Sequence, residues 1–159
     1  MKVLREGLLV GLVAYASVAA FYAVFDFLAA RGPLFTVNLL GLAVFRGVRD
    51  PSILQLPIPV DAMAVFWYNA LHLLLSLVIG LIVVRLVAQA EGHPSQARAM
   101  LFTIVAGFVV TILGVGILTE SMRPLLPWWS IVVANLVAVG MAGSYLLRTH
   151  PGIWRRLVA

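Results

Sequence analysis

Three polar side chains recur on one side of the long apolar segment 62–90. Asn69, His72 and Ser76 are three and four residues apart, a spacing that places them on one face of a helix. An imidazole beside an amide and a hydroxyl could bind a ligand, a quinone or a cofactor. This face is therefore the first candidate for chemistry in the chain.

Polar side chains in the other apolar segments fall at a similar depth. With a helical rise of about 1.5 Å per residue, His72 lies roughly 16 Å from the start of its segment. Polar groups are costly against lipid, so we expect them to face one another inside a bundle. The polar layer predicted in this way consists of Tyr22, Asn69, His72, Thr111 and Asn135. It is either a clasp of interhelical hydrogen bonds, worth about 0.6 kcal/mol each on average, or a ligand-binding site.

His72 is the only histidine within a predicted membrane core, which limits the cofactors that the chain could hold. Two histidines of this chain cannot ligate a haem across its own helices, so haem would need a second copy, a partner's ligand or another axial residue. A metal site built from His72, Asp26 and Glu120 fails because the carboxylates lie much closer to the outer surface. We expect no resident cofactor, with haem b or quinone near His72 as the alternative.

Motifs for catalysis are not found: the chain has no nucleotide-binding loop, no HExxH and no GxSxG. We therefore expect a protein that is not an enzyme. His93 and His150 fall in an inner-side loop and tail, where each is either a pH-responsive contact or an ordinary surface histidine.

Charged residues cluster near the predicted outer ends of the apolar segments. Asp26, Arg31, Asp61 and Glu120 predict an outer-face charged rim of solvated salt bridges. Asp26 has a second interpretation, as a snorkelling or paired residue with Arg31 as one candidate partner.

The composition identifies the class of protein that positions these residues. Hydrophobic residues make up 63% of the chain and charged residues 11%, whereas a soluble domain carries about 25% charged residues. A chain of 159 residues is long enough for about four membrane spans. Lipid, not nucleic acid, is the partner that the basic excess predicts.

Four apolar segments are long enough to cross a bilayer, at about 7–30, 62–87, 99–120 and 128–148. The first is interpreted as a retained span and not as a signal peptide, because it is longer than a signal peptide's apolar region. Segment 34–45 would cover only about 18 Å as a helix, which is typical of an interfacial helix. The predicted fold is an all-α membrane protein: a four-transmembrane-helix bundle with a short interfacial helix on the outer face, and residues 1–159 form a single integral membrane domain.

The distribution of cations predicts the orientation. With both termini in the cytoplasm, the inner side carries seven cations and a net charge of +5, and the outer side carries four cations and no net charge. The positive-inside rule favours this arrangement. We expect a bacterial inner (cytoplasmic) membrane protein with cytoplasmic N- and C-termini.

Small residues recur along three of the predicted spans, where they allow helices to approach closely. Ala134, Ala138 and Ala142 repeat every four residues in the fourth span. The glycines of these patterns are Gly140 and Gly143 beside them, Gly107, Gly114 and Gly116 in the third span, and Gly7 and Gly11 in the first. Two interpretations stay open: packing inside the bundle, or a docking face for a partner's helix.

Several short motifs together resemble a set of small bacterial four-span membrane proteins without established activity. They are Arg31-x-Pro33-x-Phe35-Thr36 with Gly41, Tyr68-x-x-x-His72, Trp129 with Ala134-Asn135-Leu136, and His150-Pro151. The resemblance implies the four-span fold and a bacterial inner membrane, and it singles out Tyr68, His72 and Asn135. No catalytic role comes with it.

Three functions are compatible with these features. The first is a non-catalytic accessory or assembly subunit of a larger bacterial membrane complex, respiratory or photosynthetic, whose partners are other membrane subunits or further copies of itself. The second is a membrane protein that binds quinone, haem or lipid at the layer around His72. The third, a small transporter or channel, has less support because no charged residue lies near the midplane and no paired broken helices are present.

Overall fold

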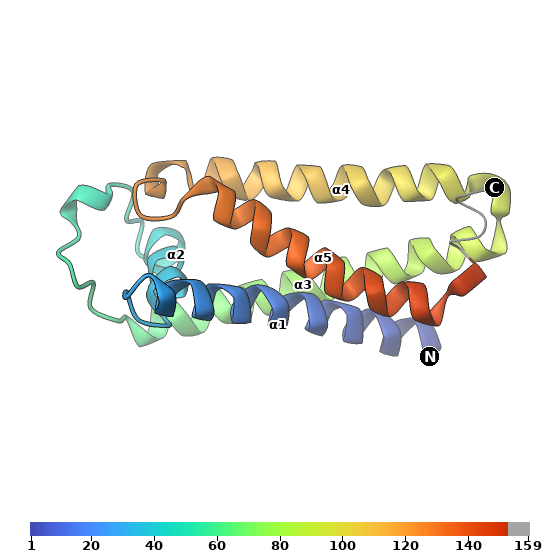
Figure 1. Cartoon of the computed structure of the whole chain (residues 1–159), viewed down its shortest axis with the longest axis horizontal. Helices are drawn as coiled ribbons and strands as arrows, with labels where there is room; N and C mark the ends of the chain where they lie inside the picture. The colour runs from blue at the N-terminus through green and yellow to red at the C-terminus, as the bar shows by residue number, and fades with distance from the viewer. Residues whose placement is uncertain (153–159) are drawn as a thin grey trace.

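The computed structural model describes residues 1–152, except the side chain of Pro94, and this part of the chain is helical without strands. Four helices are long and apolar enough to cross a membrane: α1 (Lys2–Leu28), α3 (Ala62–Gly92), α4 (Ala97–Leu118) and α5 (Trp128–Thr149). The short helix α2 (Phe35–Phe45) follows α1 (Figure 1). The predicted fold class, a four-helix membrane bundle with one short additional helix, is therefore confirmed.

The ends of the helices differ from the predicted spans for local reasons. Helix α3 continues to Gly92 because residues 88–91 include good helix formers. It ends there because the next residue, His93, immediately precedes a proline. Helix α1 ends at Leu28, after which Ala30 and Gly32 adopt positive φ angles of 55° and 84°. These left-handed residues turn the chain back toward α2.

The four spans are packed unequally. Helices α1 and α3 run side by side and share the most extensive interface, and α5 packs mainly against α1. Helix α4 is the least extensively packed of the four, with α3 and α5 as its neighbours. Figure 1 shows α5 crossing diagonally, from a start near the end of α4 to an end near the first turns of α1.

Glycines determine how closely α1 and α3 approach. A Cβ atom added to Gly80 would meet the Gly7 carbonyl oxygen and would lie 2.7 Å from the Gly11 Cα. A Cβ on Gly11 would lie 2.6 Å from the Leu77 Cα. The two backbones are therefore in direct contact, an arrangement that small residues make possible in lipid.

Helix α2 closes the end of the bundle at which the connecting segment 46–61 lies (Figure 1). Leu39 and Leu40 of α2 are buried, and Gly41 packs against the backbone of Ala64 in α3. The buried cluster at this end consists of Phe35, Leu39, Leu40, Met122, Leu126 and Ile131. This short helix is thus packed into the end of the bundle. It also forms part of the connection between α1 and α3.

Candidate functional site: polar clusters and an open helix face

His72 lies beside two tyrosine rings at the interface of α1 and α3. The Tyr15 hydroxyl donates a hydrogen bond of 2.9 Å to Asn69 Oδ1, and the Tyr15 ring centroid is 5.2 Å from that of His72. The Tyr68 ring is the second neighbour of the imidazole, with centroids 6.2 Å apart. Within residues 1–152, neither ring nitrogen of His72 has a hydrogen-bond partner.

The structure brings together only part of the predicted polar layer. Asn69 and His72 share the cluster with Tyr15, whereas the Tyr22 hydroxyl lies 3.4 Å from Ser130 Oγ. The other two members, Thr111 and Asn135, each donate to a carbonyl four residues earlier in their own helices. The single layer spanning all four helices is therefore not formed by hydrogen bonds.

The sequence prediction missed Tyr15 because the glycine contacts, and not the helix ends, set the register of α1 against α3. Gly11 packs on the backbone at residues 76–77, which places Tyr15 opposite His72 in the antiparallel pair. Tyr22 lies two turns farther along α1, nearer the connecting loops.

Asp26 is fully buried, so it is not part of a solvated rim as one interpretation of the sequence predicted. Its carboxylate accepts hydrogen bonds of 2.7 Å from both the backbone N–H and the hydroxyl of Thr36, and Arg31 Nη2 lies 3.3 Å away. Arg31 also donates to the Leu125 carbonyl at 2.8 Å, and its guanidinium lies 4.4 Å from the Phe35 ring centroid. The two hydrogen bonds from Thr36 to Asp26 fix the end of α1 to the first turn of α2.

The other two acids of the predicted rim, Asp61 and Glu120, form ion pairs at the surface. Asp61 caps α3 by accepting from the backbone N–H groups of residues 63 and 64, and it pairs with Arg46 at 2.8 Å. The hydrogen bond from Arg46 is the main reason why the pKa of Asp61 falls to about 2. Glu120 and Arg123 are 3.7 Å apart and both exposed.

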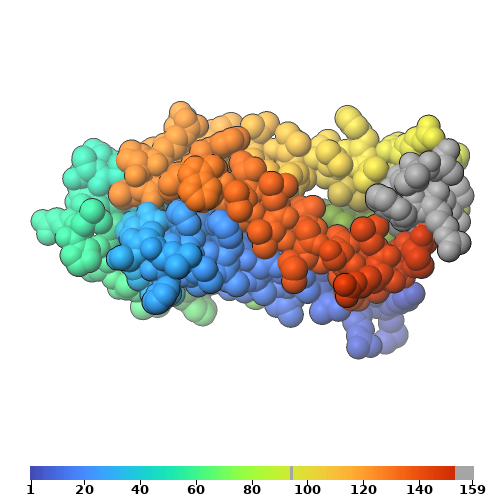
Figure 2. Space-filling model, in the orientation of Figure 1, coloured from blue at the N-terminus to red at the C-terminus, as the bar shows by residue number. Residues whose placement is uncertain are grey.

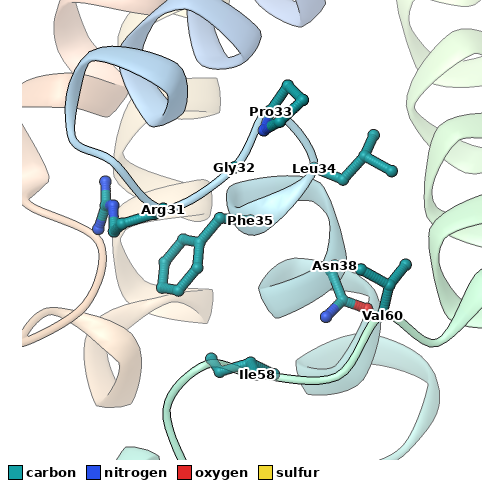
Figure 3. Close-up of a pocket in the computed structure, with 8 residues that line it drawn as sticks. All are labelled: Arg31, Gly32, Pro33, Leu34, Phe35, Asn38, Ile58 and Val60. Atoms are coloured by element: carbon teal, nitrogen blue, oxygen red, sulfur yellow. The ribbon is translucent and has the colours of Figure 1, made fainter.

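A cavity of about 170 Å³ opens beside the first turn of α2. Figure 3 shows Phe35 and Asn38 of α2 facing Ile58 and Val60 of the connecting segment across it. The amide of Asn38 is already engaged, since it donates to the Pro59 carbonyl and accepts from the Asp61 N–H. The cavity lies at the loop end of the bundle, separate from the cluster around His72.

At the opposite end, His150 joins three helices. Its Nε2 lies 2.8 Å from Glu6 Oε1 of α1, and its Nδ1 lies 2.9 Å from Glu91 Oε2 of α3. The imidazole is buried, so it is not the surface histidine of one sequence interpretation. Burial lowers the pKa of His150, but the hydrogen bonds and charges of Glu91 and Glu6 outweigh this effect and raise it above 6.5.

One side of α4 carries several small side chains beside the exposed Val110. Thr103, Gly107, Thr111 and Gly114 are spaced four, four and three residues apart and so lie on one side of the helix; we call them the small strip. A Cβ added to Gly107 or Gly114 would meet no atom within 4 Å. The small strip is thus not filled by the described part of this chain.

Helices α4 and α5 are in close contact where Gly116 meets Trp128. A Cβ on Gly116 would lie 2.5 Å from Trp128 Nε1, whereas one on Gly140 or Gly143 of α5 would meet no atom within 4 Å. Figure 2 shows the yellow part of α4 separated from the red part of α5, with the green of α3 visible between them. The small-residue patterns therefore divide: α1 and α3 use theirs internally, and the glycines at 107, 114, 140 and 143 are open.

No group of three potential metal ligands occurs within the residues that the structure describes. Comparison with protein-family models, with curated proteins and with solved structures finds no match for this chain.

Proposed function

We propose that the protein is a non-catalytic accessory or assembly subunit of a larger membrane complex, and that it binds a transmembrane helix of a partner subunit along the small strip of α4. The observation that carries this proposal is the contrast between two sets of glycines. Gly7, Gly11 and Gly80 are in backbone contact within the chain, whereas Gly107 and Gly114 meet nothing.

The physics of helix association in lipid supports this use of the small strip. Helices in a bilayer gain no hydrophobic energy by associating, so close packing and a few hydrogen bonds must hold them together. A glycine costs about 1 kcal/mol of helix stability relative to alanine. Open glycines on a weakly packed helix are best explained if another helix fills the space.

We further propose that the membrane is a bacterial inner membrane, with both termini in the cytoplasm. The pairing of charges supports this orientation. At the loop end, three of the four described cations, Arg31, Arg46 and Arg123, each lie within 4 Å of an acidic side chain, and Arg49 does not. At the other end, the described cations Lys2, Arg5, Arg85, Arg98 and Arg148 have no such partner in residues 1–152, and they are available to anionic headgroups.

Site-specific photo-cross-linking in native membranes tests the proposed helix-binding face. A photoreactive residue at Gly107 should give one discrete cross-linked protein. The matched control is Val109, which lies two residues farther on α4, is 47% exposed and points to the other side of the helix; it should give lipid adducts only.

A second measurement separates a partner from chance proximity. Gly107→Leu adds bulk where nothing obstructs it, so the isolated protein should fold normally while the complex is lost on native mass measurement. Equal cross-linking at residues 107 and 109, or a complex unaffected by Gly107→Leu, would contradict the proposal.

A second candidate function, binding of a small ligand at His72, has one specific observation in its favour. The imidazole lies beside two tyrosine rings, Tyr15 and Tyr68, and its nitrogens are unpartnered in the described chain. Organic extraction and an optical spectrum of the purified protein test it. Bound quinone or haem that His72→Ala removes would support this function, and an empty extract would exclude it.

A further inference from the structure

His150 is held by two carboxylates in a way that fixes its protonation state. A neutral imidazole has one N–H donor and one acceptor nitrogen, and a carboxylate can only accept. Both nitrogens of His150 lie within 2.9 Å of a carboxylate oxygen, Nε2 with Glu6 and Nδ1 with Glu91. Both contacts are hydrogen bonds only if the ring carries two protons or one carboxyl group is protonated.

The surroundings of His150 favour a proton on the ring. The described groups that face it are Glu6 from α1, Glu91 from α3 and, on its own element, the Thr149 hydroxyl, which lies 3.0 Å from Glu6 Oε1. The neighbouring cations Arg5 and Arg148 are exposed. Two carboxylates therefore face one imidazole in a buried place, where an unpaired charge would be costly.

We infer that His150 is a proton-binding site that latches the end of α5 to the ends of α1 and α3, and that losing this proton releases α3. The two carboxylates are not equivalent, because the Glu6 side chain is 7% exposed and the Glu91 side chain 37%. A neutral imidazole has only one N–H to donate. It donates this N–H to Glu6, because a buried carboxylate loses more than an exposed one when a hydrogen-bond donor is removed. Glu91 then faces a lone pair, and its hydrogen bond to the ring is lost.

The direction of the pH dependence follows from the raised pKa of His150. A group whose pKa is higher in the folded state than in the unfolded state stabilises the fold below its unfolded value. The latch thus contributes fully below about pH 6.5, and its contribution is lost as the pH rises through the folded-state pKa.

Nitrogen NMR of the full chain in lipid nanodiscs, with ¹⁵N-labelled histidine, tests the proton-binding site directly. At pH 6 both ring nitrogens of His150 should be protonated, and the titration midpoint should lie above 6.5. Glu91→Gln should lower the proton affinity about tenfold or more, since an adjacent opposite charge has an effect of this size. A ring with a single proton at pH 6, or an unchanged midpoint in Glu91→Gln, would overturn the inference.

The latch itself is tested by distances. The chain has no cysteine, so spin labels can be placed at introduced cysteines without removing native ones. The exposed pair Gln89→Cys and Arg148→Cys reports on α3 and α5, and the pair Lys2→Cys and Arg148→Cys reports on α1 and α5. Between pH 6 and pH 9 the first distance should lengthen and the second should stay constant.

His150→Gln is the control for the distance measurement, because it removes the titrating ring and should abolish the dependence on pH. If His150 titrates and both distances stay fixed, the histidine binds a proton without acting as a latch. If the first distance changes equally in His150→Gln, another group is responsible. Either result would refute the latch.

Discussion

Replacing Gly80 by alanine should separate α1 from α3, although it adds only one methyl group. The new Cβ would lie 2.5 Å from the Gly11 backbone nitrogen and 2.7 Å from the Gly11 Cα. These are backbone atoms of a neighbouring helix, so no flexible side chain can move aside. The helices themselves must move apart.

The size of the effect follows from these distances. Optimal contacts between carbon atoms lie at about 3.5 Å, so the added methyl group would be roughly 0.8–1 Å too close. A gap of that size forfeits a quarter to a half of the dispersion energy of the contacts around it. Overpacking of this kind typically costs about 1–3 kcal/mol, and we expect about 2–3 kcal/mol because both sides are backbone.

Thermal unfolding in mild detergent, followed by far-UV circular dichroism, measures this loss. For a chain of this size the midpoint should fall by about 5–10 °C. Gly107→Ala is the matched control: it makes the same chemical change in another span, at a place where the new Cβ meets no atom within 4 Å. Its midpoint should equal or exceed that of the unsubstituted protein, since alanine is the better helix former.

Equal midpoints for Gly80→Ala and Gly107→Ala would refute the reasoning, because close contact at the first site and open space at the second are its only premises. A loss at Gly107 alone would show that the small strip is filled within the chain.

Three further perturbations test individual contacts. Asp26→Asn leaves Arg31, whose side chain is 24% exposed, without its buried carboxylate partner, and we expect a loss of about 3 kcal/mol in denaturant unfolding; a loss below about 1 kcal/mol would contradict a stabilising ion pair. Tyr15→Phe removes only the hydrogen bond to Asn69 and should cost about 0.6 kcal/mol in the same assay; no loss would show that the hydroxyl is otherwise satisfied. Asp61 has a folded pKa of about 2 against 3.8, so its stabilising effect should be complete above about pH 4 and disappear as the pH falls toward 2. A pH series of unfolding midpoints should show this decline, and Arg46→Gln should reduce it; identical pH profiles would contradict the assigned cause.

The four spans could be predicted from the sequence because length and hydrophobicity alone determine whether a helix can cross a bilayer. The packing between them could not. Apolar residues cover nearly all sides of α3 and α4, so the sequence carries no amphipathic pattern that would indicate the inward face. The contact between Gly80 and Gly11 then sets a register that the loop positions do not reveal.

Two of the polar contacts that the sequence did not reveal have long separations in the chain. His150 and Glu6 are 144 residues apart, and Tyr15 and Asn69 are 54 apart. Asp26 and Thr36 are only ten residues apart, and the Asp26–Arg31 pair was one of the interpretations considered. The complete burial of Asp26 depends on how α2 folds back over the end of α1. Helix propensities do not determine that arrangement.

The unequal lengths of the helices affect how the protein fits a bilayer. Helices α1 and α3 have 27 and 31 residues, or about 40 and 46 Å, whereas α4 and α5 have 22 residues each, or about 33 Å. A hydrocarbon core about 30 Å thick matches the shorter helices, so the longer pair must tilt or protrude. Because their glycines hold α1 and α3 together, they tilt as one body, and the angle between this body and α4 will follow the thickness of the surrounding membrane.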